Sequence, residues 1–382
     1  MKERPSRVLP GVILGLLAGV AAAAGPGPLE AQLRVSDLVF TAGLSAEGYR
    51  GDFSAVTVPM EDPSERVAAA VGQFGAWGGL NFLDSPDGQY LDLTFDAGLR
   101  QFAAMGYELR DYAPREWASR FQLSYGRPLG DLGRLTVRTG YRGRWVEDRP
   151  PLPLFLQPGY ESFRGSAALE LFPIQGVALD GTADLEGADY GASRFFPDIL
   201  DRRSQGIELG ARTVGSDFWS VRFFTSFRWS QYRDQPTSLT EDPFRRDRAV
   251  NIGATWSGHG QVATNLGIEG TVNRSNSNRP EYDAVSVHGD LTASLPIWEL
   301  STTVFTLFTW KSYVHVVEFD RLVPGEEADN ASIVYLDLGR PLAENLDGVL
   351  RFGWTRAETD IGGSYYQRLG TTLLLNFRPG GR

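Results

Sequence analysis

The sequence predicts an all-β protein: a transmembrane, antiparallel, up-and-down β-barrel of about 16 strands, with 14 to 18 also compatible. Three observations lead to this fold class. Apolar and polar side chains alternate in segments along nearly the whole chain, short and long connections alternate between these segments, and tryptophans gather near segment ends.

The clearest alternating segment is RLTVRTGYRGRW, residues 134–145. Its even positions carry Arg134, Arg138, Arg142 and Arg144, and its odd positions carry Leu135, Val137, Tyr141 and Trp145. Because successive side chains of a strand point to opposite faces, this strand has one cationic face and one apolar face. Soluble sheets alternate as well, so one segment does not distinguish a sandwich from a membrane barrel.

Segments of this kind recur along the chain. We count sixteen, centred near residues 41, 73, 95, 121, 140, 166, 182, 209, 224, 252, 267, 288, 306, 335, 352 and 371. Each spans about 10 to 13 residues, the length of a tilted strand that crosses a bilayer. The alternation is weak in the first two segments and in those near 306 and 335.

The connections between segments alternate in length. Those after even-numbered segments are mostly tight and rich in turn residues, at 85–88, 126–133, 172–176, 214–217, 257–260, 295–298 and 340–348. Those after odd-numbered segments are mostly longer, as at 48–65, 147–159, 190–202, 233–245 and 315–330. Outer-membrane barrels have short periplasmic turns and longer extracellular loops, whereas a Greek-key sandwich has no reason to alternate in this way.

Tryptophans lie near both ends of the predicted strands. Trp117, Trp145, Trp229 and Trp310 lie near the long-loop ends, and Trp219, Trp256 and Trp298 near the short-turn ends. Amphipathic rings settle at the two interfaces of a bilayer, so this placement predicts two aromatic belts.

The first residues are typical of a secretory signal. The basic segment 1–7 precedes the apolar run 8–24, which is short against the roughly 20 apolar residues that a spanning helix needs. Cleavage after Ala24 or after Ala31 fits the small residues present, and the sequence does not choose between them. We therefore expect a signal peptide over 1–31 and a single barrel domain over 32–382.

Composition excludes several kinds of site and partner. The chain has no cysteine, so it can form neither a disulfide nor a zinc–thiolate site. Its formal net charge is -10, and removal of residues 1–31, which carry three basic and two acidic side chains, leaves -11. An acidic balance of this size argues against nucleic acid as a partner.

These features together resemble bacterial outer-membrane β-barrels of the porin-like kind, over about residues 33–378, by architecture and not by a family motif. Such proteins end in an aromatic-terminated strand that the barrel assembly machinery recognises, and LLLNF, ending at Phe377, matches it with five residues following. The resemblance implies the outer membrane of a Gram-negative envelope, with membrane lipid, the assembly machinery and small hydrophilic solutes as partners. It implies no cofactor and no metal, and it leaves the oligomeric state open.

A barrel in lipid places its apolar face outward and its polar face around an aqueous lumen. An arginine at mid-membrane on the lipid side would cost about 2 to 4 kcal/mol, which fixes Arg138 and Arg142 inside. The same parity predicts further lumen residues, with Arg120, Arg138, Arg142 and Arg164 as a basic patch beside an acidic one. The full candidate set is Asp92, Asp96, Arg100, Arg120, Arg138, Arg142, Arg164, Glu170, Asp180, Asp184, Glu208, Arg222, Arg228, Glu269 and His288, with Glu186 beside them.

These charges allow two interpretations of the interior. They can orient and filter solutes in an open pore, or they can pair with one another and fill a closed interior. The leading hypothesis is a passive channel for small hydrophilic solutes. The alternative is a non-conducting envelope barrel, or the outer pore of a polysaccharide or protein export system.

An outer-membrane hydrolase is the weakest hypothesis. Ser286, His288 and Asp290 share one parity of a single strand. Residues two apart on a strand are about 6.5 to 7 Å apart, too far for the hydrogen-bonded chain that a nucleophile needs. We therefore predict no enzyme activity.

Overall fold

The computed structural model describes residues 34–51, 67–105, 115–147, 159–190, 201–216, 218–237, 243–277, 281–314, 331–358 and 365–380. Sixteen strands form within these ranges. They are β1 (Arg34–Gly51), β2 (Val67–Asp84), β3 (Tyr90–Met105), β4 (Arg115–Pro128), β5 (Gly133–Glu147), β6 (Tyr160–Ile174), β7 (Val177–Asp189), β8 (Arg202–Ser216), β9 (Trp219–Pro236), β10 (Phe244–Gly258), β11 (Val262–Ser275), β12 (Tyr282–Leu295), β13 (Leu300–Tyr313), β14 (Ala331–Ala343), β15 (Leu346–Glu358) and β16 (Tyr365–Phe377).

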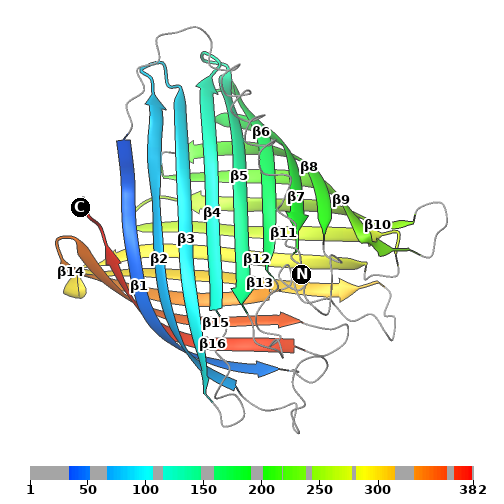
Figure 1. Cartoon of the computed structure of the whole chain (residues 1–382). Coiled ribbons are helices and arrows are strands. Elements are labelled where there is room, and N and C mark those ends of the chain that lie inside the picture. Colours follow the sequence, from blue (N-terminus) through cyan, green and yellow to red (C-terminus); the bar gives the residue numbers. More distant parts are fainter. Residues whose placement is uncertain are drawn as a thin grey trace.

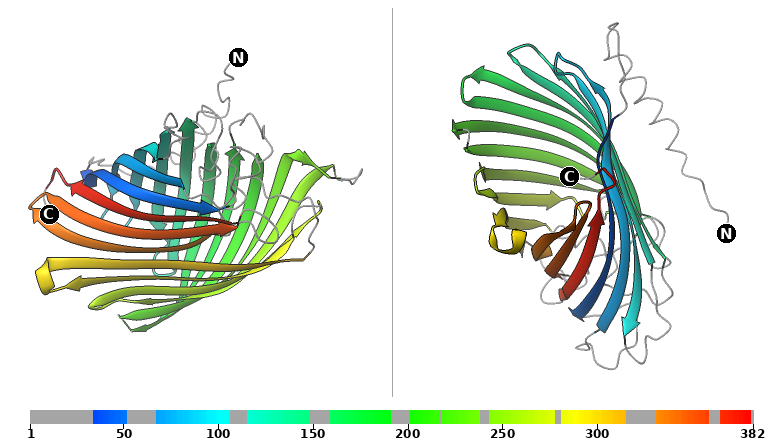
Figure 2. Two further views of the ribbon diagram at one scale, coloured as in Figure 1. Left: turned by 90° about the horizontal axis from the view of Figure 1, so that it is seen from below. Right: turned by 90° about the vertical axis from the view of Figure 1, so that its left-hand side faces the viewer.

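The strands close into one antiparallel up-and-down barrel. Each strand pairs with its neighbours in the chain, and β1 pairs with β16 in a register that sets Phe40 opposite Phe377 and Leu44 opposite Leu373. In Figure 1 the strands β2 to β5 stand upright in front of β11 to β16, which run across behind them. Figure 2 shows the red β16 lying beside the blue β1, where the barrel closes. The opposed walls cross because strands of a barrel tilt against its axis by about 35–45°.

The predicted number of strands and the alternation of connections are confirmed. Every connection after an even-numbered strand within the barrel is short, as at 344–345 between β14 and β15, and those after odd-numbered strands are longer. The strands themselves run over 13 to 18 residues, longer than expected. A bilayer needs only about 9–11 residues per tilted strand, so the ladders continue past the membrane.

The outer face of the barrel carries the apolar parity. Leu44, Phe223, Ile252 and Leu373 are more than half exposed, although they are large apolar side chains in the middle of strands. A soluble protein buries such residues, whereas a barrel in lipid presents them to acyl chains. Leu373 and the other mid-strand residues therefore form the membrane-facing surface.

Tryptophans lie toward both rims of this apolar surface. Trp219 begins β9 at its short-turn end, and Trp229 lies ten residues further toward the long loop; both side chains are exposed. Ten residues span about 33 Å along a strand, which a tilt of about 45° reduces to about 23 Å along the barrel axis. This matches the roughly 25 Å apolar band of outer-membrane barrels.

The signal segment 1–31 with its cleavage positions, and most of the long-loop residues, lie outside the described residues. Among the described residues, no helix is long and apolar enough to cross a membrane. The last strand ends at Phe377, whose side chain is exposed on the outer face.

Candidate functional site

The inner wall of the barrel can be followed from strand to strand, because directly opposed residues of an antiparallel pair lie on one face. Arg138 of β5 is opposite Ser166 of β6, which is opposite Asp184 of β7. The residues next to these in sequence, such as Val137 and Leu185, are exposed on the outer face. By this criterion all fifteen sequence candidates lie on the inner wall.

The acidic part of the wall, on β6 to β8, is interleaved with arginines. Arg222 of β9 donates from Nε to Asp180 Oδ1 at 3.1 Å, contacts Asp180 Oδ2 as well, and pairs with Glu208 at 2.6 Å. Arg212 of β8 pairs with Glu170 of β6. The carboxylates of these two groups are therefore bound to cations of the same wall.

Two further carboxylates of β7 share arginines. Asp184 pairs with Arg164 at 3.2 Å and with Arg228 at 3.5 Å. Glu186 pairs with Arg202 at 3.7 Å and with Arg228 at 3.6 Å. The sequence predicted a basic patch beside an acidic one, but the structure shows the acidic patch held by arginines from β6, β8 and β9.

A second ion-pair network joins β1, β3, β4 and β5. Arg100 pairs with Glu47 at 2.5 Å and lies 3.8 Å from Glu116, which also accepts from Arg144 Nε at 2.8 Å. The Arg100 guanidinium lies 4.9 Å from the ring centroid of Phe102. Of this network, sequence reasoning singled out only Arg100 as a lumen candidate.

The ion pairs within the described residues follow the wall and do not cross the lumen. The widest of them, such as Arg100–Glu47, Arg212–Glu170 and Arg222–Asp180, join strands two apart in the barrel, and the others join nearer positions. Opposite walls of a 16-strand barrel are eight strands apart. Among the described residues, the lumen charges therefore pair along the wall, and no ion pair joins its two opposite sides.

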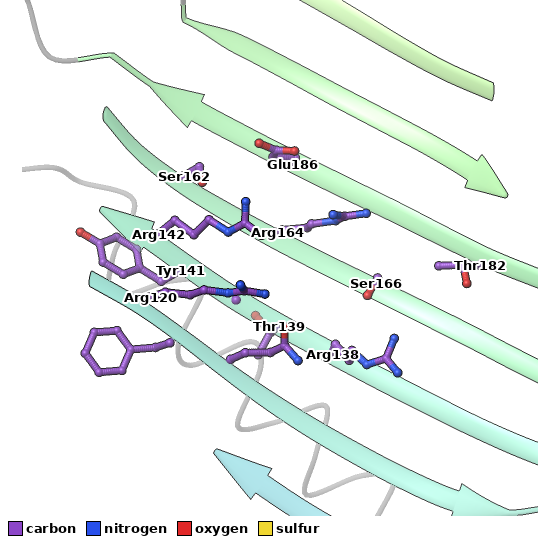
Figure 3. Close-up of a pocket in the computed structure, with 13 residues that line it drawn as sticks. Arg120, Arg138, Thr139, Tyr141, Arg142, Ser162, Arg164, Ser166, Thr182 and Glu186 are labelled. Carbon is purple, nitrogen blue, oxygen red and sulfur yellow. The ribbon is translucent and has the colours of Figure 1, made fainter. Parts of the chain in front are cut away.

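We call Arg120 of β4 and Arg138 and Arg142 of β5, which line one cavity, the arginine cluster. Within the described part of the chain, none of the three forms an ion pair with a carboxylate. Figure 3 shows their guanidinium groups, with that of Arg164, on one side of the sheet, while Tyr141 extends to the other. They line a cavity of about 210 Å³ on the inner wall.

Asp92, Asp96, Glu269 and His288 complete the predicted set. Asp96 is the register partner of Arg120, yet the two form no ion pair in the structure. Asp92 lies four residues before Asp96 on the same face of β3. Among the described residues no group of histidines and carboxylates is arranged to hold a metal ion.

Ser286, His288 and Asp290 do not form a hydrogen-bonded chain. The Ser286 hydroxyl lies 3.0 Å from that of Thr309, and Asp290 accepts from Asn265 Nδ2 at 3.1 Å. The His288 ring instead lies over Gly267, where a Cβ atom would be 2.1 Å from the ring. The structure therefore offers no contact between a nucleophile and a base at this position.

An aromatic patch on β13 and β14 faces the lumen and was not predicted. Phe305 stacks on Tyr335 with ring centroids 4.9 Å apart, and Arg351, paired with Asp337, lies 5.0 Å from the Tyr335 ring centroid. β13 is eight strands from β5 in the barrel, so this patch lies opposite the arginine cluster. Both faces of these strands carry large apolar residues, and alternation therefore gave no signal. The charged pair Asp337 and Arg351, which shares the face of Tyr335, was the available clue.

Comparison with known proteins gives no family. No protein-family model matches the chain, and no curated protein matches it. A solved structure described as a bacterial polysaccharide outer membrane secretin is similar at TM-score 0.40 and 10% identity, over 88% of this chain and 98% of that one.

Two other solved structures are similar at the same level. The TodX deltaS2S3 mutant monoaromatic hydrocarbon channel matches at TM-score 0.40 and 8% identity, over 90% of both chains. The outer membrane protein opdK from Pseudomonas aeruginosa matches at TM-score 0.36 and 13% identity, over 89% of this chain and 99% of that one. These neighbours are outer-membrane β-barrels.

Proposed function

We propose that the chain is a passive channel of the bacterial outer membrane, through which small hydrophilic solutes diffuse along the polar inner wall. The observation that carries the proposal is the course of the ion pairs between described residues, each of which joins positions no more than two strands apart along the wall. An interior closed by salt bridges would need pairs between opposed strands. Barrels of 16 to 18 strands are wide enough to enclose an aqueous channel.

The composition of the inner wall also supports passage of polar solutes. Charged and hydroxyl side chains alternate with small residues along β4 to β9, as in the run Arg138, Ser166, Asp184 and Gly206 across four strands. A solute that leaves bulk water at such a wall exchanges hydrogen bonds to water for hydrogen bonds to protein. The apolar outer face with its two tryptophan rims supports the membrane location.

Single-channel recording in planar bilayers tests the proposal. The full chain, folded into detergent and shown to be folded by its heat-dependent shift in gel mobility, is expected to give steady open-channel current at constant voltage. Liposome swelling with neutral sugars of increasing size would then measure the width of the path. Absence of current from protein that passes the gel test would overturn the channel function and favour a non-conducting barrel.

Location is tested separately by fractionation. The protein is expected in the outer-membrane fraction of a Gram-negative cell, with the mature N-terminus beginning after Ala24 or Ala31. Recovery in the soluble periplasmic fraction would contradict the proposed location.

A further inference from the structure

We propose that the arginine cluster is a binding site for an oxyanion, the phosphate or carboxylate group of a small solute, within the lumen. The inference rests on the proposed channel function and adds the chemical class of the solute. Its basis is the contrast between these three arginines and the described arginines on the inner wall of β6 to β9, which are engaged with carboxylates.

The register of β4 and β5 places two cations directly opposite one another. Arg120 pairs with Arg142 across the ladder, where Cβ atoms of opposed residues lie about 4.5–5.5 Å apart. Like charges in this position destabilise a sheet. An oxyanion held between Arg120 and Arg142 would reduce that repulsion. Asp96 lies opposite Arg120 on the other neighbouring strand but forms no ion pair with it.

Arg138 extends the cationic surface along the same strand. It lies four residues before Arg142 on the inner face of β5, a separation of about 13 Å at the rise of an extended strand. Figure 3 shows its guanidinium displaced along the strand from those of Arg120 and Arg142. Arg120 and Arg142 are therefore the primary contacts of the bound oxyanion. Arg138 attracts an oxyanion that approaches the site, or binds a second anionic group of the same solute.

The one carboxylate that lines the cavity is engaged elsewhere. Glu186 pairs with Arg202 and Arg228 on the side away from β5. The cavity lining holds four arginines, with Arg164 as the fourth, and this single glutamate, so its formal charge is +3. Arg164 is held by Asp184 at 3.2 Å, which leaves the arginine cluster as the cations available to a ligand.

The size and polarity of the cavity fit a small oxyanion. Its 210 Å³ is well above the roughly 10–15 Å³ that a single water molecule needs, so a small oxyanion has room there. The polar groups of Gln122, Ser162, Ser166 and Thr182 line it and can bond to the hydroxyl groups of a solute. The planar guanidinium forks of arginine bind carboxylate and phosphate through two parallel hydrogen bonds, which a single ammonium group cannot do.

Block of the channel by inorganic phosphate and by acetate, recorded in potassium chloride, tests the site. The decisive variant is Arg120→Gln/Arg142→Gln. The matched control is Arg212→Gln, which also removes positive charge from the inner wall but lies in an ion pair with Glu170. Phosphate is expected to reduce the wild-type current, and the double variant is expected to need at least about tenfold more phosphate for half-block, which is 1.4 kcal/mol of lost binding. The control is expected to stay within about twofold of wild type.

The outcomes separate the site from the channel. If neither phosphate nor acetate reduces the wild-type current, the oxyanion site is overturned and the channel stands. The same conclusion follows if phosphate blocks the double variant as strongly as wild type, or if Arg212→Gln loses as much block as the double variant. Block by only one of the two anions assigns the solute class to phosphates or to carboxylates. If folded protein passes no current, the channel function is wrong, and calorimetric titration of the detergent-folded barrel with phosphate then tests the site alone. Phosphate binding by wild type that the double variant loses would support the site. Absence of phosphate binding to wild type would overturn the site.

Discussion

Arg222 of β9 and Asp180 of β7 form a two-point ion pair that passes over the intervening strand β8 at Gly210. Gly210 is opposite Asp180 in the ladder, and a Cβ atom there would lie 2.7 Å from the Arg222 Nη2 atom and from both Asp180 carboxylate oxygens. The ion pair therefore depends on the absence of a side chain at position 210.

Gly210→Ala is expected to displace this pair and to lower the free energy of unfolding by on the order of 1 kcal/mol. The measurement is urea unfolding of the barrel in lipid vesicles, followed by tryptophan fluorescence. Gly353→Ala is the matched control, because Gly353 is a strand glycine whose Cβ position has no heavy atom within 4 Å. Equal stability of the two variants would show that the ion pair tolerates a side chain at 210.

The pair of Arg245 and Asp247 on β10 is the most buried ion pair of the described wall. The two residues are 6% and 7% exposed, with Nη2 and Oδ2 at 2.6 Å. Arg245 also donates to Gln235 at 2.9 Å and lies 4.2 Å from the Tyr232 ring centroid.

Arg245→Met is expected to cost about 3–5 kcal/mol of unfolding free energy, because it leaves the Asp247 carboxylate buried without its cation. The double variant Arg245→Met/Asp247→Asn is expected to be more stable than Arg245→Met, since both charges are then absent. A double-mutant cycle on urea unfolding measures the coupling. Additive losses in the two single variants would mean that the buried pair is not coupled.

Neighbouring positions of β7 test which face of the barrel meets lipid. Leu185 is 65% exposed on the outer face, whereas Thr182 lies on the inner wall opposite Glu208. Leu185→Arg is expected to cost about 2–4 kcal/mol of stability in vesicles, the cost of arginine at the bilayer midplane. Thr182→Arg is expected to be tolerated, since the new cation faces water and a carboxylate. A reversed ranking in a vesicle-folding assay would contradict the assignment of faces.

Alternation was sufficient to predict the number of strands and, in the clearly alternating strands, the face that each side chain occupies. The segment 134–145 became β5 with its arginines inside, and Phe377 ended the last strand as expected. Strand length was underestimated because the ladder continues beyond the membrane, where the apolar parity gives way to polar residues and the pattern fades.

The partners of the lumen charges could not be predicted. The alternation pattern places Glu170 of β6 and Arg212 of β8 on the same face of the sheet. Whether the two side chains meet depends on how far each reaches across the intervening strand β7. That the arginine cluster has no carboxylate partner among the described residues is recognised only after the other pairs are known. Phe305 and Tyr335 were not predicted, for another reason. Both faces of their strands carry large apolar residues, so a two-residue alternation does not distinguish the lumen-facing side chains from the lipid-facing ones.

The most direct test of the whole account is a single-cysteine scan of β5 with spin labels, in vesicles. The chain has no cysteine, so each introduced one is labelled uniquely. Labels at positions 138 and 142 are expected to collide with a water-soluble nickel complex, and labels at 137 and 141 with oxygen dissolved in the lipid. The opposite pattern, or odd positions shielded from both reagents, would contradict a barrel whose apolar parity meets lipid and whose arginines surround water.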